Sequence, residues 1–280
     1  MLSVDPSSSA SERVPVYLST TCAFPKGPER AFQLARDLGY DGIEVLVTGN
    51  STTRTGDELY ALMQRYQVPV AAIHAPTLLF TQQVWGGAWK KIQRSVLLAH
   101  ELGVRTIVVH PPFRWQGKYA TGFAEGVRRS NEEYGVLITV ENMYPWRAAG
   151  QQNSKMYRPH YDPVPLDYDF VTWDFSHAAI AGADSLAAVQ ALGSRLTHLH
   201  VCDGTDNGKD EHLPPGMGTQ PVTETLQYLG ETGWRGSATV EVTTRRWRKE
   251  PDGVERVLAQ CLDFARTHLQ RPASNDILGP

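Results

Sequence analysis

The 280-residue sequence is poor in cysteine, and its few cysteines lie far apart. Cys22, Cys202 and Cys261 are an odd number and form no CxxC pair, which argues against a disulfide framework. Because unpaired thiols persist in reducing compartments, we expect a cytoplasmic protein. The chain also lacks any run near the roughly 20 apolar residues that a membrane helix needs, so we expect no membrane partner.

The two ends of the chain lack the patterns of ordered or targeting segments. Residues 1–13 hold a serine run and charged side chains but no apolar stretch, and so do not resemble a signal peptide. We expect a disordered N-terminal arm over residues 1–13 and a flexible C-terminal tail over residues 271–280. The net charge of −3 lacks the general basic excess that is typical of proteins bound to polyanions, while a local basic patch stays compatible with it.

What the sequence does have is an alternation of short β-branched runs with helical stretches. The expected strands cover residues 14–20, 43–48, 69–74, 105–110, 136–141, 170–175, 196–201 and 237–242. Helices are expected over residues 29–38, 56–66, 88–102, 122–134, 185–192, 222–229 and 252–268. Residues 142–169 are rich in proline and tyrosine, and we expect a loop there with at most a short helix.

Strands separated by crossover helices predict an α/β fold, a single closed (β/α)8 TIM barrel over residues 14–270. The alternative is an open doubly wound sheet, which requires a glycine-rich phosphate loop after its first strand. The segment at that place, TTCAFP at residues 20–25, has no glycine. The absence of this loop favours the barrel.

Ionisable side chains stand at or near the ends of six consecutive expected strands. They are His74, His110, Glu141, Asp174, His200 and Glu241. Strands of a parallel barrel are buried on both faces and should be apolar, so a charged residue there needs a partner. In one barrel mouth these carboxylates would repel each other, and a bound cation removes that conflict. The sequence therefore predicts a divalent metal site at the mouth.

Three further candidate ligands lie close to these strand ends. His177 follows Asp174 by three residues where a strand turns into a helix, which suits converging ligands. Asp210 and His212 form an Asp-x-His pair beside a turn rich in glycine and proline. A rigid turn of this kind can place both side chains on one ion.

These motifs resemble the xylose isomerase-like TIM barrel superfamily, also called AP endonuclease family 2. The resemblance extends from GYDGIE at residues 39–44 to VEV at residues 240–242. Its most specific parts are WDFSHA at residues 173–178, His200 with the Asp-Gly pair at 203–204, and HLPPGMG at residues 212–218. The resemblance implies a xylose isomerase-like barrel with one of two kinds of chemistry.

The first kind is a metal-dependent isomerase or epimerase of a sugar or sugar phosphate, with a place in carbohydrate metabolism. The resemblance implies that one ion is held by a core quartet, which would be Glu141, Asp174, His200 and Glu241. Glu141 and Glu241 would also be the catalytic acid and base that move a proton. His177 would be a third catalytic residue that holds a substrate oxygen or the enediolate.

The second kind is an endonuclease-four-type AP endonuclease, a phosphodiesterase that binds abasic DNA. Such enzymes place nine ligands on three zinc ions, and each has a candidate here: the quartet with His74, His110, His177, Asp210 and His212. The segments after Glu141 and His74 do not resemble the loops that grip DNA, which favours the isomerase. A non-catalytic binding protein is a third alternative, which the complete quartet disfavours.

The substrate contacts, the metal and the oligomeric state stay open. Glu44 binds substrate or serves as a salt-bridge partner. Trp115 is among the loop aromatics that either face a sugar ring or plug the mouth, and Arg245 either meets a phosphate or carboxylate or lies in solvent. Histidine ligands favour zinc or manganese and an oxygen-rich quartet also accepts magnesium, with one to three ions. Barrels of this kind often pair through mouth loops, so a homodimer is plausible.

Overall fold

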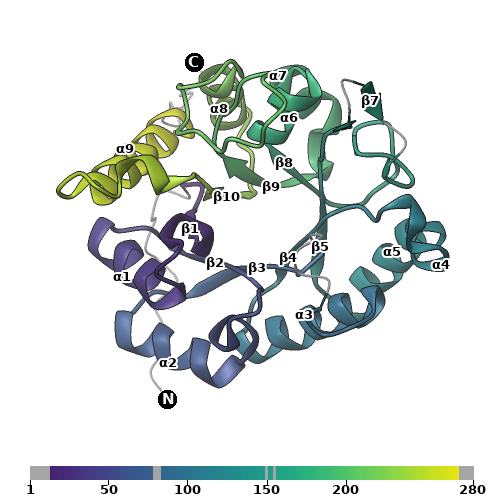
Figure 1. The fold of residues 1–280 in the computed structure, drawn as a ribbon, viewed down its shortest axis with the longest axis horizontal. Coiled ribbons are helices and arrows are strands. Elements are labelled where there is room, and N and C mark those ends of the chain that lie inside the picture. The colour runs from purple at the N-terminus through teal and green to yellow at the C-terminus, as the bar shows by residue number, and fades with distance from the viewer. Residues whose placement is uncertain (1–12, 78–82, 149–150, 154–155, 271–280) are drawn as a thin grey trace, which may run out of the picture.

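The computed structural model describes residues 13–77, 83–148, 151–153 and 156–270. Within them, eight parallel strands close into a barrel in the order β1-β10-β9-β8-β5-β4-β3-β2. The strands are β1 (Val16–Ser19), β2 (Gly42–Leu46), β3 (Val70–His74), β4 (Thr106–Val109), β5 (Leu137–Glu141), β8 (Val171–Asp174), β9 (Leu196–Val201) and β10 (Ser237–Val240). Helices surround these strands in Figure 1. The predicted TIM barrel is confirmed.

The helices of the outer ring follow the strands in chain order. They are α1 (Pro28–Leu38), α2 (Gly56–Tyr66), α3 (Ala88–Leu102), α4 (Lys118–Thr121), α5 (Phe123–Tyr134), α6 (Phe175–Ala181), α7 (Ser185–Leu192), α8 (Val222–Glu231) and α9 (Gly253–His268). Short 3-10 turns are η1 (Thr20–Ala23), η2 (Ser51–Arg54), η4 (Arg114–Gln116), η6 (Gly193–Arg195) and η7 (Thr244–Trp247). Helices α1 and α3 end where Gly39 and Gly103 take the left-handed conformation, which supplies the stop signal seen in the sequence.

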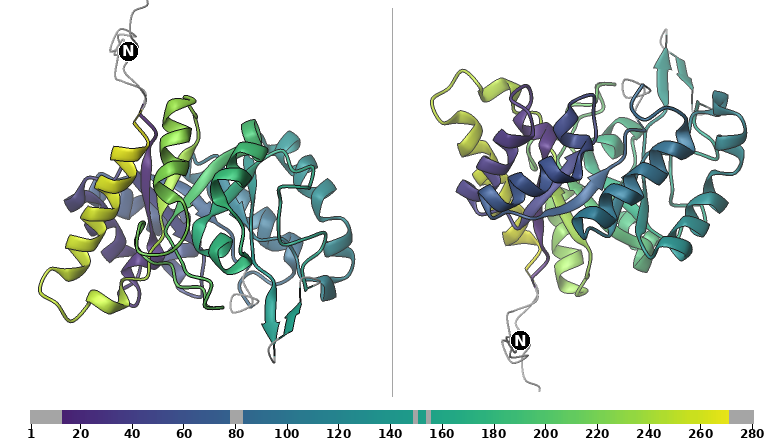
Figure 2. Two further views of the ribbon diagram at one scale, coloured as in Figure 1. Left: turned by 90° about the horizontal axis from the view of Figure 1, so that it is seen from above. Right: turned by 90° about the horizontal axis from the view of Figure 1, so that it is seen from below.

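The loop between β5 and β8 differs from its prediction. Instead of at most a short helix, it forms an antiparallel hairpin of β6 (Trp146–Ala148) with β7 (Gln151–Asn153). This hairpin projects past one end of the molecule in both views of Figure 2. Three-residue strands of this kind are too short to show a periodic pattern, so no strand could be predicted here.

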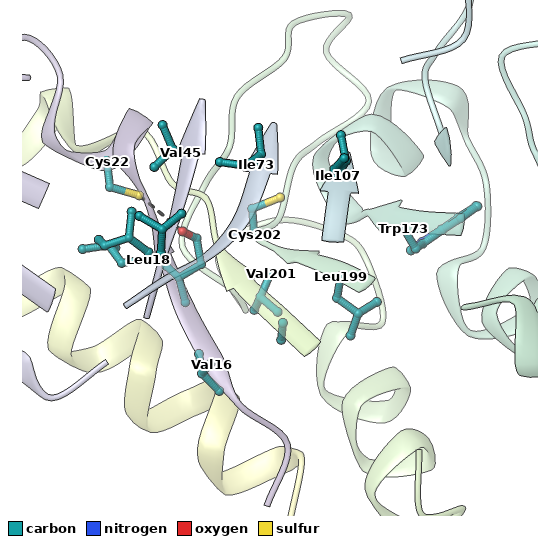
Figure 3. Packing of buried hydrophobic residues seen from close by; sticks show 14 of the residues in the cluster. Val16, Leu18, Cys22, Val45, Ile73, Ile107, Trp173, Leu199, Val201 and Cys202 are labelled. Carbon is teal, nitrogen blue, oxygen red and sulfur yellow. Dashed lines mark hydrogen bonds between the residues drawn. The ribbon is translucent and has the colours of Figure 1, made fainter. Parts of the chain in front are cut away.

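The two faces of the barrel strands carry different kinds of side chain. Glu44 on β2 contacts His198 on β9, although β1 and β10 stand between these strands in the sheet, so both side chains point into the barrel. Because side chains alternate along a strand, the intervening residues point outward. Figure 3 shows this apolar outer layer, which includes Leu18, Ile73, Ile107, Trp173 and Leu199. The expectation of apolar strands therefore holds for the outer face, whereas the inner face combines apolar residues such as Ala72 with charged and polar ones.

The predicted ends of the chain lie mostly outside the described residues. This applies to the predicted C-terminal tail, residues 271–280, and to residues 1–12 of the predicted arm, whereas Arg13 is described and forms an ion pair with Asp41. Across the described ranges, no helix combines the length and apolar character that a membrane span requires. Cys22, Cys202 and Cys261 are buried free thiols.

Candidate metal centre

A cavity of about 240 Å³ opens where the carboxyl ends of the barrel strands meet. Seven of the nine predicted ligands line it, namely His74, His110, Glu141, His177, Asp210, His212 and Glu241. The other two, Asp174 and His200, are fully buried and contact several of the seven. The structure thus brings all nine predicted ligands together at the mouth.

The predicted quartet converges on one nitrogen atom, Nδ1 of His200. This atom lies 3.0 Å from Oε1 of Glu141 and 3.0 Å from Oε2 of Glu241. Oδ2 of Asp174 lies 3.5 Å from it. Three carboxylates from three different strand ends therefore face the same imidazole edge, which is the donor set that a hard or borderline divalent cation prefers.

Asp174 and His177 are presented to the site by the turn from β8 into α6. Asp174 is the last residue of β8 and caps α6, because its Oδ1 accepts a hydrogen bond from the backbone N–H of His177 at 2.7 Å. Asn142 fixes the backbone of Asp174 from the next strand, accepting from its N–H at 2.6 Å and donating to its carbonyl at 2.9 Å. Both side chains converge as the sequence predicts.

Two further groups of ligand atoms flank the quartet. Nε2 of His110 and Nε2 of His74 lie 2.8 and 3.2 Å from Oε2 of Glu141. On the other side, Asp210 lies 3.3 Å from His177 and 3.0 Å from His212. In each group of three, the ligand atoms all lie within 4.8 Å of one another. Each group could therefore hold an ion of its own.

The loop that carries Asp210 and His212 is fixed by one buried carboxylate, Asp203. Its two oxygens accept backbone hydrogen bonds from residues 204, 216, 218 and 220 at 2.8–3.2 Å. A Cβ atom on Gly218 would lie 2.3 Å from Asp203 Oδ1, which is too close, so only glycine fits at this position. The loop is therefore tied to the end of β9 rather than free to swing.

His212 adopts a strained backbone conformation within this loop. Its φ of 43° lies in the left-handed region, which is costly for a residue other than glycine. The strain is held by Ser176 Oγ, which accepts from the His212 N–H at 3.1 Å, and by the N–H of Thr243, which donates to the His212 carbonyl at 2.8 Å. Strain of this kind is typical of ligand and active sites.

Opposite charges in the site outweigh the effect of burial. Burial alone lowers the pKa of His200, yet Glu44, Glu141 and Glu241 raise that pKa well above its ordinary value. Burial raises the pKa of Glu141, whereas His200 and His110 hold it well below its usual range. The pKa values of Asp174, Asp210 and Glu241 are lowered in the same way. The histidines around these carboxylates thus favour their ionised forms, and a divalent cation would do the same.

The three predicted substrate contacts lie elsewhere. Glu44 has no exposed surface and forms ion pairs with His198 and His200, so the salt-bridge alternative fits its position. Trp115 is 56% exposed and stacks on Phe113, and it does not line the mouth cavity. Arg245 is exposed in η7, outside the cavity lining.

Sequence reasoning missed several residues that complete the site. Ser19 and Thr21 donate to Oε1 of Glu241 at 3.3 and 3.1 Å, and the hydroxyl run at the end of β1 was the only available signal. The thiol of Cys202 lies 3.6 Å from both oxygens of Asp174. Arg248 lines the mouth cavity in place of Arg245.

Comparison with known proteins agrees with this fold. Residues 32–266 match the family described as xylose isomerase-like TIM barrel, and the chain belongs to that family. It is 43% identical over 277 residues to the uncharacterized protein Rv0498 of Mycobacterium tuberculosis (strain ATCC 25618 / H37Rv), covering 92% of this chain and 99% of that protein. It is 25% identical over 247 residues to fructoselysine 3-epimerase of Shigella flexneri, covering 80% of this chain and 88% of the relative.

Solved structures share the fold over most of their length. A D-tagatose 3-epimerase-like protein superposes with a TM-score of 0.64 at 22% identity, covering 90% of this chain and 98% of that one. The IOLI protein, solved with a zinc atom, superposes with a TM-score of 0.63 at 16% identity, covering 91% and 98%. At these identities the likeness establishes the fold.

Proposed function

We propose that this chain is a divalent-metal-dependent sugar epimerase or isomerase that moves a proton between Glu141 and Glu241. The observation that carries the proposal is the convergence of three carboxylates on Nδ1 of His200 at 3.0–3.5 Å. The relationship to fructoselysine 3-epimerase, over 80% of this chain, supports an epimerase rather than a binding protein.

Glu141, Asp174, His200 and Glu241 would hold one ion of manganese, magnesium or zinc. A divalent cation bound there supplies Lewis acidity, which lowers the pKa of a C–H bond beside a sugar carbonyl. The lowered pKa values of both glutamates keep them ionised and ready to accept a proton. One carboxylate removes the carbon-bound proton from one face of the sugar, and the other glutamate, which has first taken up a proton from solvent, delivers that proton to the opposite face. The first glutamate then releases its proton to solvent. Configuration at that carbon is thereby inverted.

Each glutamate has an oxygen held in place by neighbouring donors. Oε2 of Glu141 faces the Nε2 atoms of His110 and His74, and Oε1 of Glu241 accepts from the hydroxyls of Ser19 and Thr21. His177 lines the same cavity and would donate to a substrate oxygen. These contacts fix the two proton-transfer groups before substrate arrives, which is how general acid–base residues gain efficiency.

The size and rim of the cavity favour a small, ring-shaped substrate. Its volume of about 240 Å³ is below the roughly 300–1,000 Å³ of drug-sized pockets. Phe24 lines it and is 68% exposed, so its ring offers an apolar face to a sugar.

Solvent deuterium exchange tests this proposal. Chelator-treated protein is reloaded with Mn²⁺, Mg²⁺ or Zn²⁺ and incubated with a panel of ketoses in ²H₂O, and NMR follows the C–H next to the carbonyl. We expect deuterium in one carbon position and the appearance of its epimer, both lost in Glu141→Gln and Glu241→Gln. Metal-loaded wild-type protein that labels no ketose in the panel would contradict the proposal.

The flanking groups of ligands favour one second candidate, the endonuclease-four-type AP endonuclease. His74, His110 and Glu141 on one side, and His177, Asp210 and His212 on the other, could hold two more ions. Metal analysis and incision of a duplex with one abasic site test it together. Three ions per chain with incision that Glu141→Gln lacks would establish the nuclease and overturn the epimerase. One ion without incision would reject the nuclease.

The homodimer and the cytoplasmic location stay predictions from the sequence. A homodimer predicts a mass of about twice that of the chain by light scattering, with mouth loops protected from proteolysis. The cytoplasmic location predicts that the three thiols react with a thiol reagent after unfolding of protein isolated under oxygen-free conditions.

A further inference from the structure

Glu44 is one of the fully buried carboxylates of the barrel interior. It lies on β2, has no exposed surface, and reaches across the barrel to β9. Its Oε1 lies 3.0 Å from Nε2 of His200, and its Oε2 lies 2.8 Å from Nε2 of His198. The hydroxyl of Thr239 donates to the same Oε2 at 2.8 Å. Three donors therefore converge on a carboxylate that no substrate can reach.

Both oxygens of Glu44 have partners that hold the carboxylate in place. Nε2 of His198 lies 2.8 Å from Oε2 of Glu44, and Nδ1 of the same ring lies 2.7 Å from the hydroxyl of Ser237. With Oε2 satisfied by His198 and Thr239, Oε1 is left to accept from Nε2–H of His200. The carboxylate is thus aimed at His200 by groups behind it.

We infer that Glu44 is the positioning residue of the metal centre, acting through His200. The bond at Nε2 fixes the rotation of the His200 ring and leaves Nδ1 as the atom that faces Glu141, Asp174 and Glu241. A carboxylate behind a ligating histidine also makes that histidine a stronger donor, and its loss typically weakens metal binding about 10–100-fold. This inference rests on the proposed metal site and assigns Glu44 a role that excludes substrate contact.

Metal affinity measured without substrate tests the role of Glu44. Glu44→Gln keeps the shape of the side chain but supplies only one acceptor oxygen. We expect Mn²⁺ affinity, measured by competition with a chromophoric chelator, to fall about 10–100-fold. Ser185→Ala is a matched control, because Ser185 is equally buried and hydrogen-bonded to Trp173 and Gln220 behind the barrel wall. Its affinity should equal that of the wild type.

A double-mutant comparison separates positioning from a general structural effect. In a His200→Ala background, Glu44→Gln should cause no further loss of Mn²⁺ affinity, because the group that it orients is gone. Additive losses, or wild-type affinity in Glu44→Gln, would overturn the inference. A protein that binds Mn²⁺ in this way but epimerises no sugar would overturn the proposed function alone.

A second cavity adjoins the mouth cavity, and charged side chains line it. It measures about 150 Å³ and shares Phe24, Thr244 and Arg248 with the mouth cavity. Two of its carboxylates are neutralised by arginines, since Glu255 pairs with Arg30 and Glu250 with Arg256.

We call this second cavity the annex. Two of its cationic side chains, Lys26 and Arg248, form no ion pair with a carboxylate in the described ranges of the chain. The guanidinium of Arg248 instead lies 5.6 Å from the ring centroid of Phe24, at the boundary of the two cavities. Its charge therefore faces the place where a substrate would extend from the mouth.

We propose that this annex binds an anionic group on the substrate, a phosphate or carboxylate remote from the reacting carbon. A ligand that fills both cavities places its neutral ring among the metal ligands and its anion between Lys26 and Arg248. This proposal rests on the proposed function and narrows its substrate to anionic sugars.

Calorimetric binding to Mn²⁺-loaded protein tests the annex without relying on turnover. D-fructose 6-phosphate should bind at least about 10-fold more tightly than D-fructose, and inorganic phosphate should compete with it. Arg248→Met and Lys26→Met should each reduce that preference, while Arg246→Met, an exposed neighbour outside both cavities, should not. A carboxylated sugar that outcompetes the phosphate ester would identify the anion as a carboxylate. Equal binding of charged and neutral sugars, or binding of neither, would overturn the annex.

Discussion

The two faces of strand β9 carry different kinds of side chain and contribute to different properties of the protein. Leu199 and Val201 point outward into the apolar layer of Figure 3, and both are fully buried. His198 and His200 alternate with them and point inward, where each meets a carboxylate oxygen of Glu44. One strand of six residues therefore contributes to the hydrophobic core on one side and to the candidate metal centre on the other.

The inner face is costly unless each of its polar groups finds a partner. Its deeper layer meets this condition with short contacts, such as the 2.6 Å hydrogen bond from Thr172 to Thr139 and the 2.8 Å hydrogen bond from Thr239 to Glu44. The upper layer holds more carboxylates and histidines than a structural network needs. Under the proposed function, the polar groups below the mouth position their neighbours, whereas those at the mouth bind the metal and react with the substrate.

The largest expected effect comes from a change on the inner face at the mouth. Glu141→Gln should reduce epimerase turnover about 10²–10⁴-fold, because it removes a proton-transfer group. The fold should persist, since the histidines around Glu141 can lose their protons when its charge is removed. Turnover and circular dichroism measured on the same sample check both parts. A variant that unfolds would show that the division between the faces is wrong.

A change on the outer face should have the opposite effect. Leu199→Ala should lower the free energy of unfolding by about 2–5 kcal/mol, because it leaves a cavity between the barrel and its helices. Mn²⁺ affinity should stay within about twofold of the wild type, although the substitution lies between His198 and His200. Urea denaturation and chelator competition measure the two quantities. Loss of affinity on the scale of His200→Ala would show that the faces are coupled.

The smallest expected effect is a dependence on pH that differs with and without metal. The raised pKa values of His177, His200 and His212 mean that their charged forms stabilise the metal-free fold. This stability is fully present below the unfolded pKa of about 6.5 and is lost as pH rises through the folded values. Metal binding displaces these protons, so it should strengthen over the same range.

Melting curves from pH 6 to pH 9 should therefore diverge. We expect the melting temperature of chelator-treated protein to fall by a few degrees as pH rises, and the increment from saturating Mn²⁺ to grow. Curves that stay parallel would mean that the histidines carry no proton in the metal-free protein.

The barrel and the quartet could be predicted from the sequence for a physical reason. Strand and helix periods repeat, and parallel strands bring their carboxyl ends to one mouth, so ionisable residues at strand ends must meet. His110 and Glu241 lie one residue past their strands and still reach the site. Contacts across the barrel could not be predicted, because the sequence does not show which inner residues face each other, and Glu44 stayed ambiguous as a result.

Short turns limited the prediction in the same way. Arg245 and Arg248 are three residues apart at η7, and only the path of that turn decides that Arg248 reaches the cavity. Trp115 was a candidate to stack on a sugar ring, yet its own ring stacks on Phe113, with 4.5 Å between the ring centroids, and it does not line the mouth cavity. Neither outcome is encoded in a periodic pattern.

The tie between Asp203 and its loop has a consequence for how such sites are inherited. Because one carboxylate just past the end of β9 holds four backbone groups of the loop, the placement of Asp210 and His212 depends on the whole loop and not on these two residues alone. A barrel that acquires this pair must acquire residues 203–220 as one unit, with glycine at 218. We therefore expect evolution and protein engineering to exchange residues 203–220 as one segment. A chimaera that receives residues 210–212 alone should fail to hold the two side chains in place.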